Sequence, residues 1–386
     1  MSKLDYDLEK LRKEGAIGKY HVSQMIVDWI NEKVVFHKIK NYDSEAAAAE
    51  EIHGIIRKEK TIAYMLDEFL KKDEQLSLVE KHIHFYSRND VDKFQYLKKI
   101  RFPSGNSGKY SYVQAKLPPG FTFVYTGSYS FRNVTFPDLY IATDPIDVFA
   151  ICDDTGPWMS ASYNELLSMQ ECIDNAHGNV LIFGLGLGCC VYECLLKEDV
   201  NSITVVDLSQ DVIDMFRKHL AEQFPHPEKL NIVNANAFEY MKGVADGKYD
   251  YIYMDIWRTP LDGLGPYLKM LQYEKKMPHT RFGYWVEEGI LDLIGNLIFL
   301  NIQLRLFPDM PQARMNAMNH PASFIFGKRI FDKYKPNSVE ELKKVVETDK
   351  IRQILLELDC EPDLITAIDT EVSADNERYP EYQRTN

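Results

Sequence analysis

Residues 179–207 of this chain, NVLIFGLGLGCCVYECLLKEDVNSITVVD, decide its fold. The apolar run 180–183 is followed by three glycines at alternate positions, Gly184, Gly186 and Gly188. A stretch with helical character comes next, and a second apolar run ends in Asp207. This order predicts a buried parallel strand, a tight turn, a helix and a second strand that carries a carboxylate at its end.

The glycine turn and Asp207 together indicate a nucleoside-binding half-fold. Glycines suit such a turn because they accept positive φ angles and let backbone N–H groups approach a ligand closely. Asp207 lies roughly 20 residues beyond the turn, where an acidic side chain can accept hydrogen bonds from the hydroxyls of a ribose.

Strands and helices alternate after Asp207. We expect a helix over 210–223, a strand over 230–235, a short helix after residues 236–238, and a strand over 249–255. This alternation predicts a doubly wound, mostly parallel sheet. Ligand-binding groups collect at the carboxyl ends of such strands, where the chain places Asn236 and Asp255.

The fold class expected for the whole chain is α/β, with a Rossmann-like doubly wound sheet. A small antiparallel β-sheet and a helical N-terminal region precede it. The sequence suggests four consecutive parts: a helical region 1–103, a small antiparallel β-sheet domain 104–158, a Rossmann-like cofactor-binding domain 159–335, and a C-terminal helical segment with a polar tail 336–386.

Local patterns add detail to these parts. Apolar residues recur at helical spacing from residue 3 to about residue 99, and Ser44 is placed as the N-cap of one helix. A helix is expected from Ser160 to about Ala176, leading into the glycine turn. The polar tail 371–386 is expected to be frayed or disordered, because it has almost no aliphatic residues.

Charge and cysteine usage exclude several classes of function. The net charge of −13 argues against a nucleic-acid partner, because proteins that bind the phosphate backbone normally carry a basic excess. No metal is expected, since His82 and His84 are interpreted as surface residues and the cysteines lack the spacing of a zinc site. The six cysteines are expected to be reduced, buried small hydrophobes: Cys152, Cys172, Cys189, Cys190, Cys194 and Cys360.

The sequence also bears on location. The N-terminus lacks the apolar core of a signal peptide, and the longest apolar stretch, 290–300, is too short to span a bilayer. A cytoplasmic protein without a membrane partner is expected. The sequence leaves the oligomeric state open, a homo-oligomer included.

The glycine spacing separates two kinds of nucleotide. A dinucleotide fingerprint, G-x-G-x-x-G, would need its third glycine at position 189, which is Cys189. The spacing found here, G-x-G-x-G, is associated with S-adenosylmethionine enzymes, whose cofactor has no pyrophosphate to bind. The spacing therefore favours S-adenosylmethionine as the cofactor, and the family resemblance described next adds its decarboxylated form.

From about residue 148 to 260 the chain resembles the spermidine synthase family, which has a class I S-adenosylmethionine-type fold. The phrases that carry the resemblance are DDTGPWMSASYNELL, VLIFGLGLG, VVDLSQDVIDMFRKHL, NANAFEYM and YDYIYMD. The resemblance implies that Asp207 binds the ribose, Asn236 the adenine amino group, and Asp255 the reacting amine or the cofactor's tail. It implies that Tyr163 and Glu165 lie near the substrate. The glycine turn, Leu208 and Ala237 complete the expected cofactor-binding set.

Two departures from the family pattern concern the substrate. The family usually has an Asp in the glycine turn where this chain has Leu187, and a second Asp where it has Arg258. A diamine needs carboxylates at both ends, because an unpaired buried ammonium costs several kcal/mol. Arginine suits a carboxylate or phosphate instead. A small or peptidic substrate other than a simple diamine is therefore expected.

The expected reaction is alkyl transfer from a sulfonium, for which the protein must position a nucleophile and accept its proton. Asp255 is the first candidate for the base or amine-orienting group, followed by Tyr163 and Glu165. Trp257 is a candidate for the wall of the substrate pocket, and Arg258 for binding an acidic group. Plainer interpretations remain open: a strand-end cap for Asp255, a solvated helix residue for Glu165, packing for Trp257 and an ion pair for Arg258.

Three functional hypotheses follow. The first is a methyltransferase or a close alkyl-transfer relative that uses S-adenosylmethionine. The second is an aminopropyltransferase that uses the decarboxylated cofactor. The third is a non-catalytic protein that keeps the nucleoside pocket and interacts through its helical N-terminal region.

Overall fold

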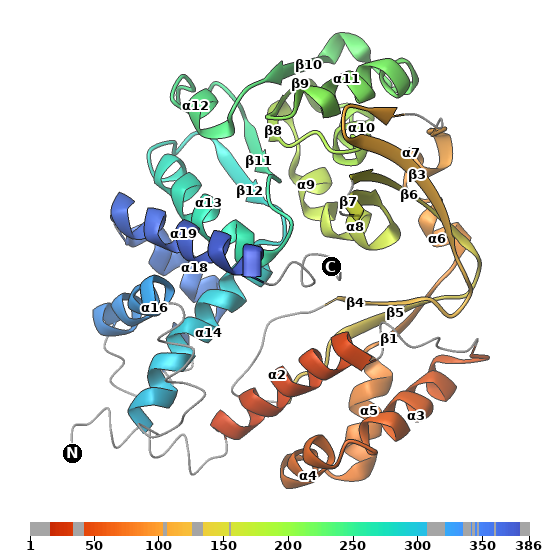
Figure 1. Cartoon of the computed structure of the whole chain (residues 1–386), viewed down its shortest axis with the longest axis vertical. Helices are drawn as coiled ribbons and strands as arrows, with labels where there is room; N and C mark the ends of the chain where they lie inside the picture. The colour runs from red at the N-terminus through yellow and green to blue at the C-terminus, as the bar shows by residue number, and fades with distance from the viewer. Residues whose placement is uncertain are drawn as a thin grey trace. The chain divides into compact units, whose positions relative to one another are not determined.

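The computed structural model describes residues 16–33, 42–102, 106–125, 134–153, 156–306, 321–334, 341, 344–345, 347–358 and 360–378 (Figure 1). The chain forms two compact units. The first unit is made of Met1–Ser87, Pro118–Asp144 and Glu288–Leu358, and the second of Arg88–Leu117, Pro145–Glu287 and Asp359–Asn386. The chain thus returns to each unit more than once, whereas the sequence suggested four consecutive parts.

A five-stranded parallel sheet of the second unit has the order β10-β9-β8-β11-β12. Its strands are β8 (Gly178–Phe183), β9 (Val200–Asp207), β10 (Leu230–Asn234), β11 (Tyr251–Met254) and β12 (Arg281–Tyr284). This is the doubly wound order 3-2-1-4-5, which reverses direction beside the first strand. The last four residues of β8 are all buried, as expected for a central parallel strand with a continuous apolar run. The predicted α/β fold class is confirmed.

Helices connect and flank these strands (Figure 1). They are α6 (Arg88–Val91), α7 (Gln95–Lys99), α8 (Tyr163–Ser168), α9 (Gln170–Asn175), α10 (Cys189–Leu195), α11 (Gln210–His219), α12 (Ala237–Met241), α13 (Pro260–Glu274) and α19 (Pro362–Arg378), with 3-10 turns η1 (Ala221–Gln223) and η2 (Pro227–Lys229). Helix α11 shows how sequence sets these elements: Ser209 caps its first turn, and its apolar residues are buried on one face.

A second sheet of this unit is antiparallel, with the order β2-β3-β6-β7. Its strands are β2 (Asn106–Ser107), β3 (Tyr110–Leu117), β6 (Ile146–Asp153) and β7 (Gly156–Ala161). Strand β7 ends one residue before Ser162, which caps α8 by accepting a hydrogen bond from Glu165 N. The antiparallel sheet therefore continues directly into the helices that precede β8.

The first unit contains helices and a three-stranded sheet, β1-β5-β4. Its elements are α2 (Ala16–Lys33), α3 (Glu45–Ile56), α4 (Lys60–Phe69), α5 (Lys72–Lys81), β1 (Ile83–Tyr86), β4 (Thr122–Tyr125), β5 (Asp138–Ala142), α14 (Glu287–Leu306), α16 (Pro321–Tyr334) and α18 (Thr348–Glu357). Aliphatic residues of α2 to α5 pack with β1 and β5 in one buried core. The predicted N-cap, Ser44, accepts a hydrogen bond from Ala47 N and is confirmed.

Two expectations about strands were wrong. The region up to residue 99 is not wholly helical, because β1 pairs in parallel with β5 across 56 positions of sequence. Asp138 joins the two strands by accepting from both His82 and His84, at 2.8 and 2.9 Å. The strands expected to form one small antiparallel sheet also divide between two sheets, one in each unit. Both differences arise because strands pair with segments that are distant in the sequence. The local periodicity of the sequence does not predict such pairing.

Two expectations about helices were also wrong. The single helix expected from Ser160 to Ala176 is two short helices, α8 and α9, that meet at Met169. The tail expected to be frayed from residue 371 is helical as far as Arg378, because α19 buries Ile365, Ile368 and Val372. The remainder of that tail lies outside the described residues. Among the described helices, none has both the length and the apolar character to cross a membrane.

Candidate functional site

The glycine turn directly follows β8 in the second unit. Gly184, Gly186 and Gly188 all have positive φ angles, of 98°, 54° and 80°. A Cβ atom at Gly184 would lie 1.9 Å from the carbonyl oxygen of Asp255, so the turn passes too close to the end of β11 for any side chain there. The sequence interpretation of a tight glycine turn agrees with this geometry.

Asp207 fixes the turn from the end of β9. Its Oδ2 accepts a hydrogen bond from Leu185 N at 2.8 Å, and its Oδ1 accepts one from Ser209 N at 2.7 Å. A carboxylate offers about four acceptor positions, so each oxygen keeps one for a further donor. Asp207 can therefore shape the turn and still accept from two hydroxyls of a ribose.

Two exposed aliphatic side chains lie at the ends of the neighbouring strands. Leu208, next to Asp207, is 72% exposed, and Ile256, next to Asp255, is 41% exposed. Because β8 lies between β9 and β11, these two side chains follow the strands on either side of the glycine turn. Exposed aliphatic side chains at such positions are suited to contact the faces of a planar base.

Asn236 has a structural role that the sequence did not indicate. Its Oδ1 caps α12 by accepting from Phe238 N and Glu239 N, at 2.9 and 3.2 Å. The oxygen expected to accept from an adenine amino group is thus already engaged. The amide nitrogen remains able to donate to a ring nitrogen of the base. Ala237 is buried as the first residue of α12.

Two carboxyl groups with raised pKa values lie beside the turn. Burial, and then the negative charges of Glu165 and Asp207, raises the pKa of Asp255 to about 8. Burial raises the pKa of Glu165 to about 7, opposed by a hydrogen bond from Ser160 Oγ at 3.5 Å. Carboxyl groups with pKa values near neutrality can accept and release protons at physiological pH.

Strand β7 joins the parts of the site. Met159 Sδ lies 3.2 Å from the position of a Cβ at Gly186, and Ser160 contacts Glu165. The guanidinium carbon of Arg258 stacks 3.7 Å from the centre of the Trp158 ring. Within the described residues Arg258 has no acidic partner, so its N–H groups are available to an anionic ligand.

The remaining predicted residues have more ordinary surroundings. Trp257 is 7% exposed and donates from Nε1 to the carbonyl of Trp285 at 3.2 Å, which favours its interpretation as a packing residue. Tyr163 begins α8 and has its ring edge-on to Phe94. Leu187, where the family usually has an Asp, is buried, and its carbonyl accepts from Tyr96 OH at 2.6 Å.

Sequence reasoning missed the contribution of β7. Trp158, Met159 and Ser160 were not singled out, although they lie within the phrase that carries the family resemblance. The available signal was their position just before Tyr163 and Glu165. Their contacts with Arg258 and the glycine turn depend on folding and could not be deduced from spacing.

A cavity of about 730 Å³ lies in the first unit. Charged side chains from several helices line it, among them Lys19, Asp73, Glu74 and Lys81. None of the predicted site residues contributes to it. Convergent polar groups at strand ends are a stronger indication of a ligand site than volume, and they lie in the second unit.

The glycine turn, the strand-end carboxylates and the strand order are those of the doubly wound α/β class, in which ligands bind at the carboxyl ends of the strands. The family model of the spermine/spermidine synthase domain matches residues 160–271. Over this segment the chain is spermidine synthase-like. The resemblance predicted from the sequence is confirmed.

Curated relatives match a limited part of the chain. A polyamine aminopropyltransferase of Prochlorococcus marinus (strain NATL1A) is 29% identical over 118 residues, which cover 28% of this chain and 40% of that protein. Polyamine aminopropyltransferase 2 of Hyperthermus butylicus is 32% identical over 98 residues, which cover 25% of this chain and 31% of that protein. The chain therefore spans less than half the length of these relatives.

Solved structures show a weaker likeness. The spermidine synthase from Thermotoga maritima is 18% identical and covers 42% of this chain and 57% of its own, with a TM-score of 0.27. A TM-score this low supports no conclusion about function.

Proposed function

We propose that the second unit binds an S-adenosylmethionine-type nucleoside at the glycine turn and catalyses alkyl transfer to a small or peptidic acceptor, with methyl as the transferred group. One observation carries this proposal: Asp207 holds the turn through Leu185 and Ser209 while keeping one acceptor position on each oxygen. The turn itself approaches so closely to Asp255 that Gly184 has no room for a side chain.

The residues present fit such a nucleoside. Asp207 would accept from the ribose hydroxyls, and the exposed Leu208 and Ile256 would contact the base. When bound, the nucleoside supplies an electrophilic carbon beside a positively charged sulfur. The negative charges of Glu165 and Asp207 both act on Asp255, so the three carboxylates together favour a cation beside Asp255.

Asp255 is the proposed proton acceptor and amine-orienting group. Among the described residues, no donor makes a hydrogen bond to its carboxylate, so a bound amine can do so. As the amine forms its new bond, Asp255 takes the proton that the amine loses, and Glu165 is the second acceptor. A positive charge on the ligands would also lower the raised pKa values of both groups, so that a larger fraction of each is the carboxylate that can accept a proton.

Arg258 supports methyl transfer over aminopropyl transfer. Its guanidinium is held on Trp158 and has no acidic partner in the part of the chain that the structure describes. A carboxylate is the natural partner for such a group. S-Adenosylmethionine carries a carboxylate that its decarboxylated form lacks, and an acidic acceptor would satisfy Arg258 equally.

A second candidate is aminopropyl transfer from the decarboxylated cofactor to an amine. The names of the curated relatives support it, as does the group of three carboxylates. Arg258 counts against it, because a positive side chain repels a second ammonium group.

Calorimetric titration with S-adenosylmethionine, its decarboxylated form and S-adenosylhomocysteine tests the proposal. We expect micromolar-range binding of the two carboxylated nucleosides, and weaker binding of the decarboxylated one. A marked preference for the decarboxylated form would support aminopropyl transfer. Absence of binding by all three would contradict both enzyme functions and leave a non-catalytic interaction protein.

The variant Arg258→Ala tests whether Arg258 binds the acceptor or the cofactor. If Arg258 binds an acidic group of the acceptor, the variant raises the acceptor KM much more than the cofactor Kd. Arg258→Lys is the matched control, because it keeps the charge and loses the bidentate, stacked geometry. If Arg258→Ala raised the acceptor KM and the cofactor Kd by equal factors, Arg258 would not be a residue of the acceptor site.

A further inference from the structure

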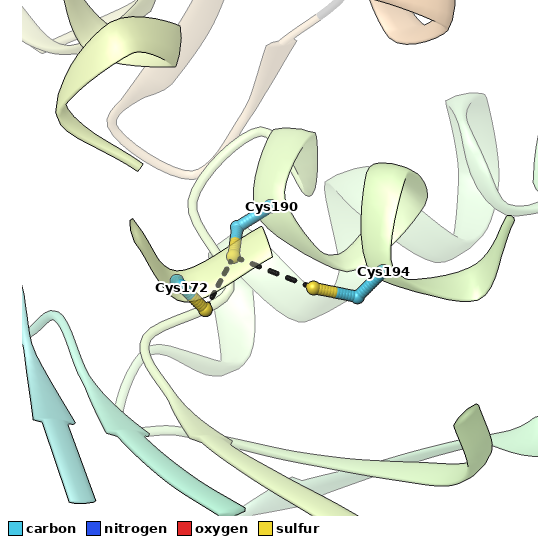
Figure 2. A group of neighbouring side chains, drawn as sticks. All are labelled: Cys172, Cys190 and Cys194. Atoms are coloured by element: carbon cyan, nitrogen blue, oxygen red, sulfur yellow. Dashed lines mark hydrogen bonds between the residues drawn. The ribbon is translucent and has the colours of Figure 1, made fainter. Parts of the chain in front are cut away.

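Three buried thiols meet between α9 and α10 in the second unit (Figure 2). Cys172 belongs to α9, whereas Cys190 and Cys194 belong to α10, four positions apart and therefore on one helical face. Cys190 Sγ lies 3.0 Å from Cys172 Sγ and 3.9 Å from Cys194 Sγ. The three sulfurs lie within 4.8 Å of one another. We call these residues the thiol cluster.

The thiol cluster has the size of a metal site. A tetrahedral zinc ion with Zn–S bonds of about 2.3 Å holds its sulfur ligands about 3.8 Å apart. The observed separations, from 3.0 Å to at most 4.8 Å, bracket that value. Small rotations of the three side chains are therefore enough to form the site. Spacing along the chain does not report this cluster, because Cys172 comes from a different helix.

Two tyrosine hydroxyls of β11 are buried without hydrogen-bond partners among the described residues. Tyr251 and Tyr253 are two positions apart, so their side chains lie on the same face of the strand. Both hydroxyls lie within electrostatic range of Cys172 and Cys190. An unsatisfied buried hydroxyl costs roughly 1–3 kcal/mol. Metal-bound thiolates would satisfy both groups.

The two helices are already held in register. Lys197, just beyond α10, donates from Nζ to the carbonyls of Ile173 and Asp174 in α9, at 2.8 and 2.9 Å. This contact joins the C-terminal ends of both helices. The thiols are therefore brought together by contacts that do not depend on a metal, as a preorganised site requires.

We propose that Cys172, Cys190 and Cys194 bind one thiophilic divalent metal ion, and that the tyrosine hydroxyls of β11 donate hydrogen bonds to its thiolate ligands. Binding releases one proton from each thiol and forms three metal–sulfur bonds. A divalent ion with three thiolates leaves one net negative charge, which the tyrosine O–H groups can stabilise by hydrogen bonding. The ion ties α9 to α10, the helix that begins at the glycine turn, and this role is independent of the reaction.

Zinc is the probe for this site. The full-length chain, stripped with a chelator under reducing conditions, is titrated with Zn²⁺ against a chromophoric competitor. We expect one tightly bound Zn²⁺ per chain. X-ray absorption of the zinc-loaded protein should show three sulfur neighbours. Both measurements use the wild-type chain. A zinc ion with only oxygen and nitrogen ligands, or the absence of stoichiometric binding, would overturn the proposal.

Variants locate the site. Cys172→Ser should abolish stoichiometric zinc binding, whereas Cys189→Ser should retain it. Cys189 is the matched control because it is buried in α10, the helix of Cys190 and Cys194, and has Tyr96 and Glu165 in its surroundings. The double variant Tyr251→Phe with Tyr253→Phe should weaken zinc affinity about 10- to 100-fold. Equal effects of Cys172→Ser and Cys189→Ser would overturn the assignment, as would a Cys172–Cys190 disulfide in the freshly purified protein.

Discussion

At the scale of single residues, Asp255 is a carboxyl group whose charge depends strongly on its surroundings. Its pKa of about 8 in the folded protein lies above the ordinary 3.8, so the folded protein binds this proton more tightly than the unfolded chain. The contribution of the protonated Asp255 to the free energy of unfolding is fully present below about pH 4 and is lost as the pH rises through about 8. Glu165 behaves in the same way up to about pH 7.

Asp255→Asn tests this charge state. The variant keeps a neutral side chain at every pH, so it should gain stability relative to the wild type as the pH rises from about 5 to about 9. Urea unfolding at a series of pH values measures the difference. Glu165→Gln is the comparison, and its gain should be complete at a lower pH. Parallel pH profiles for Asp255→Asn and the wild type would show that Asp255 has no raised pKa.

Gly184 tests the geometry of the turn. In Gly184→Ala, the new Cβ would lie 1.9 Å from a backbone oxygen at a φ of 98°, so the end of β8 must move away from β11. We expect a destabilisation of about 1–3 kcal/mol and loss of nucleoside binding. Gly54→Ala in α3 is the control, because a Cβ there meets nothing within 4 Å and should stabilise the helix by roughly 0.5–1 kcal/mol. Similar effects of the two variants would contradict the close approach.

At the scale of elements, the first turn of α11 connects stability to the site. Ser209 accepts a hydrogen bond from Val212 N through its hydroxyl, and its own N–H donates to Asp207. Ser44 caps α3 in the first unit with a comparable hydrogen bond to Ala47 N. Of the two capping serines, Ser209 is the one whose N–H donates to Asp207.

Ser209→Ala and Ser44→Ala form a matched pair. Each should destabilise its own helix by about 0.5–2 kcal/mol, measured as faster amide hydrogen exchange in that helix. Only Ser209→Ala should also weaken nucleoside binding, because the start of α11 positions the backbone donor to Asp207. An equal loss of nucleoside affinity in both variants would show that the cap of α11 makes no specific contribution to the nucleoside site.

At the scale of the whole molecule, the chain leaves the second unit after β12 and returns to it with α19. Helix α19 packs on α13, and Ile368 is fully buried there. Ile368→Ala should destabilise the second unit by about 2–5 kcal/mol. Thr366→Ala, at an exposed position of the same helix, should change stability by less than about 0.5 kcal/mol. Equal effects in denaturant unfolding would show that α19 does not belong to the core.

The parts of the molecule that the sequence predicts well are local and periodic. The run 180–183, the glycine turn and Asp207 lie within one strand-turn-helix-strand unit, so each residue constrains the next. The cap at Ser44 follows from one residue and the helix after it. These features need no knowledge of distant segments.

The parts that sequence reasoning missed depend on contacts between distant segments. Strand β1 is short and becomes a strand by pairing with β5. Trp158 joins the site by stacking with Arg258, and Cys172 joins Cys190 from another helix. The capping role of Asn236 was missed for a different reason: the short helix was expected after residues 236–238, whereas α12 begins at Ala237, directly after Asn236.

The most direct test of the nucleoside site is a crystal structure of the full-length chain with S-adenosylhomocysteine. We expect the ribose hydroxyls on the two oxygens of Asp207, the adenine in contact with Leu208 and Ile256, and the sulfur facing Asp255. The same crystals of Gly184→Ala should bind no nucleoside at this position. Density for the nucleoside elsewhere on the chain, or an adenosine that makes no contact with Asp207, would contradict the central claim.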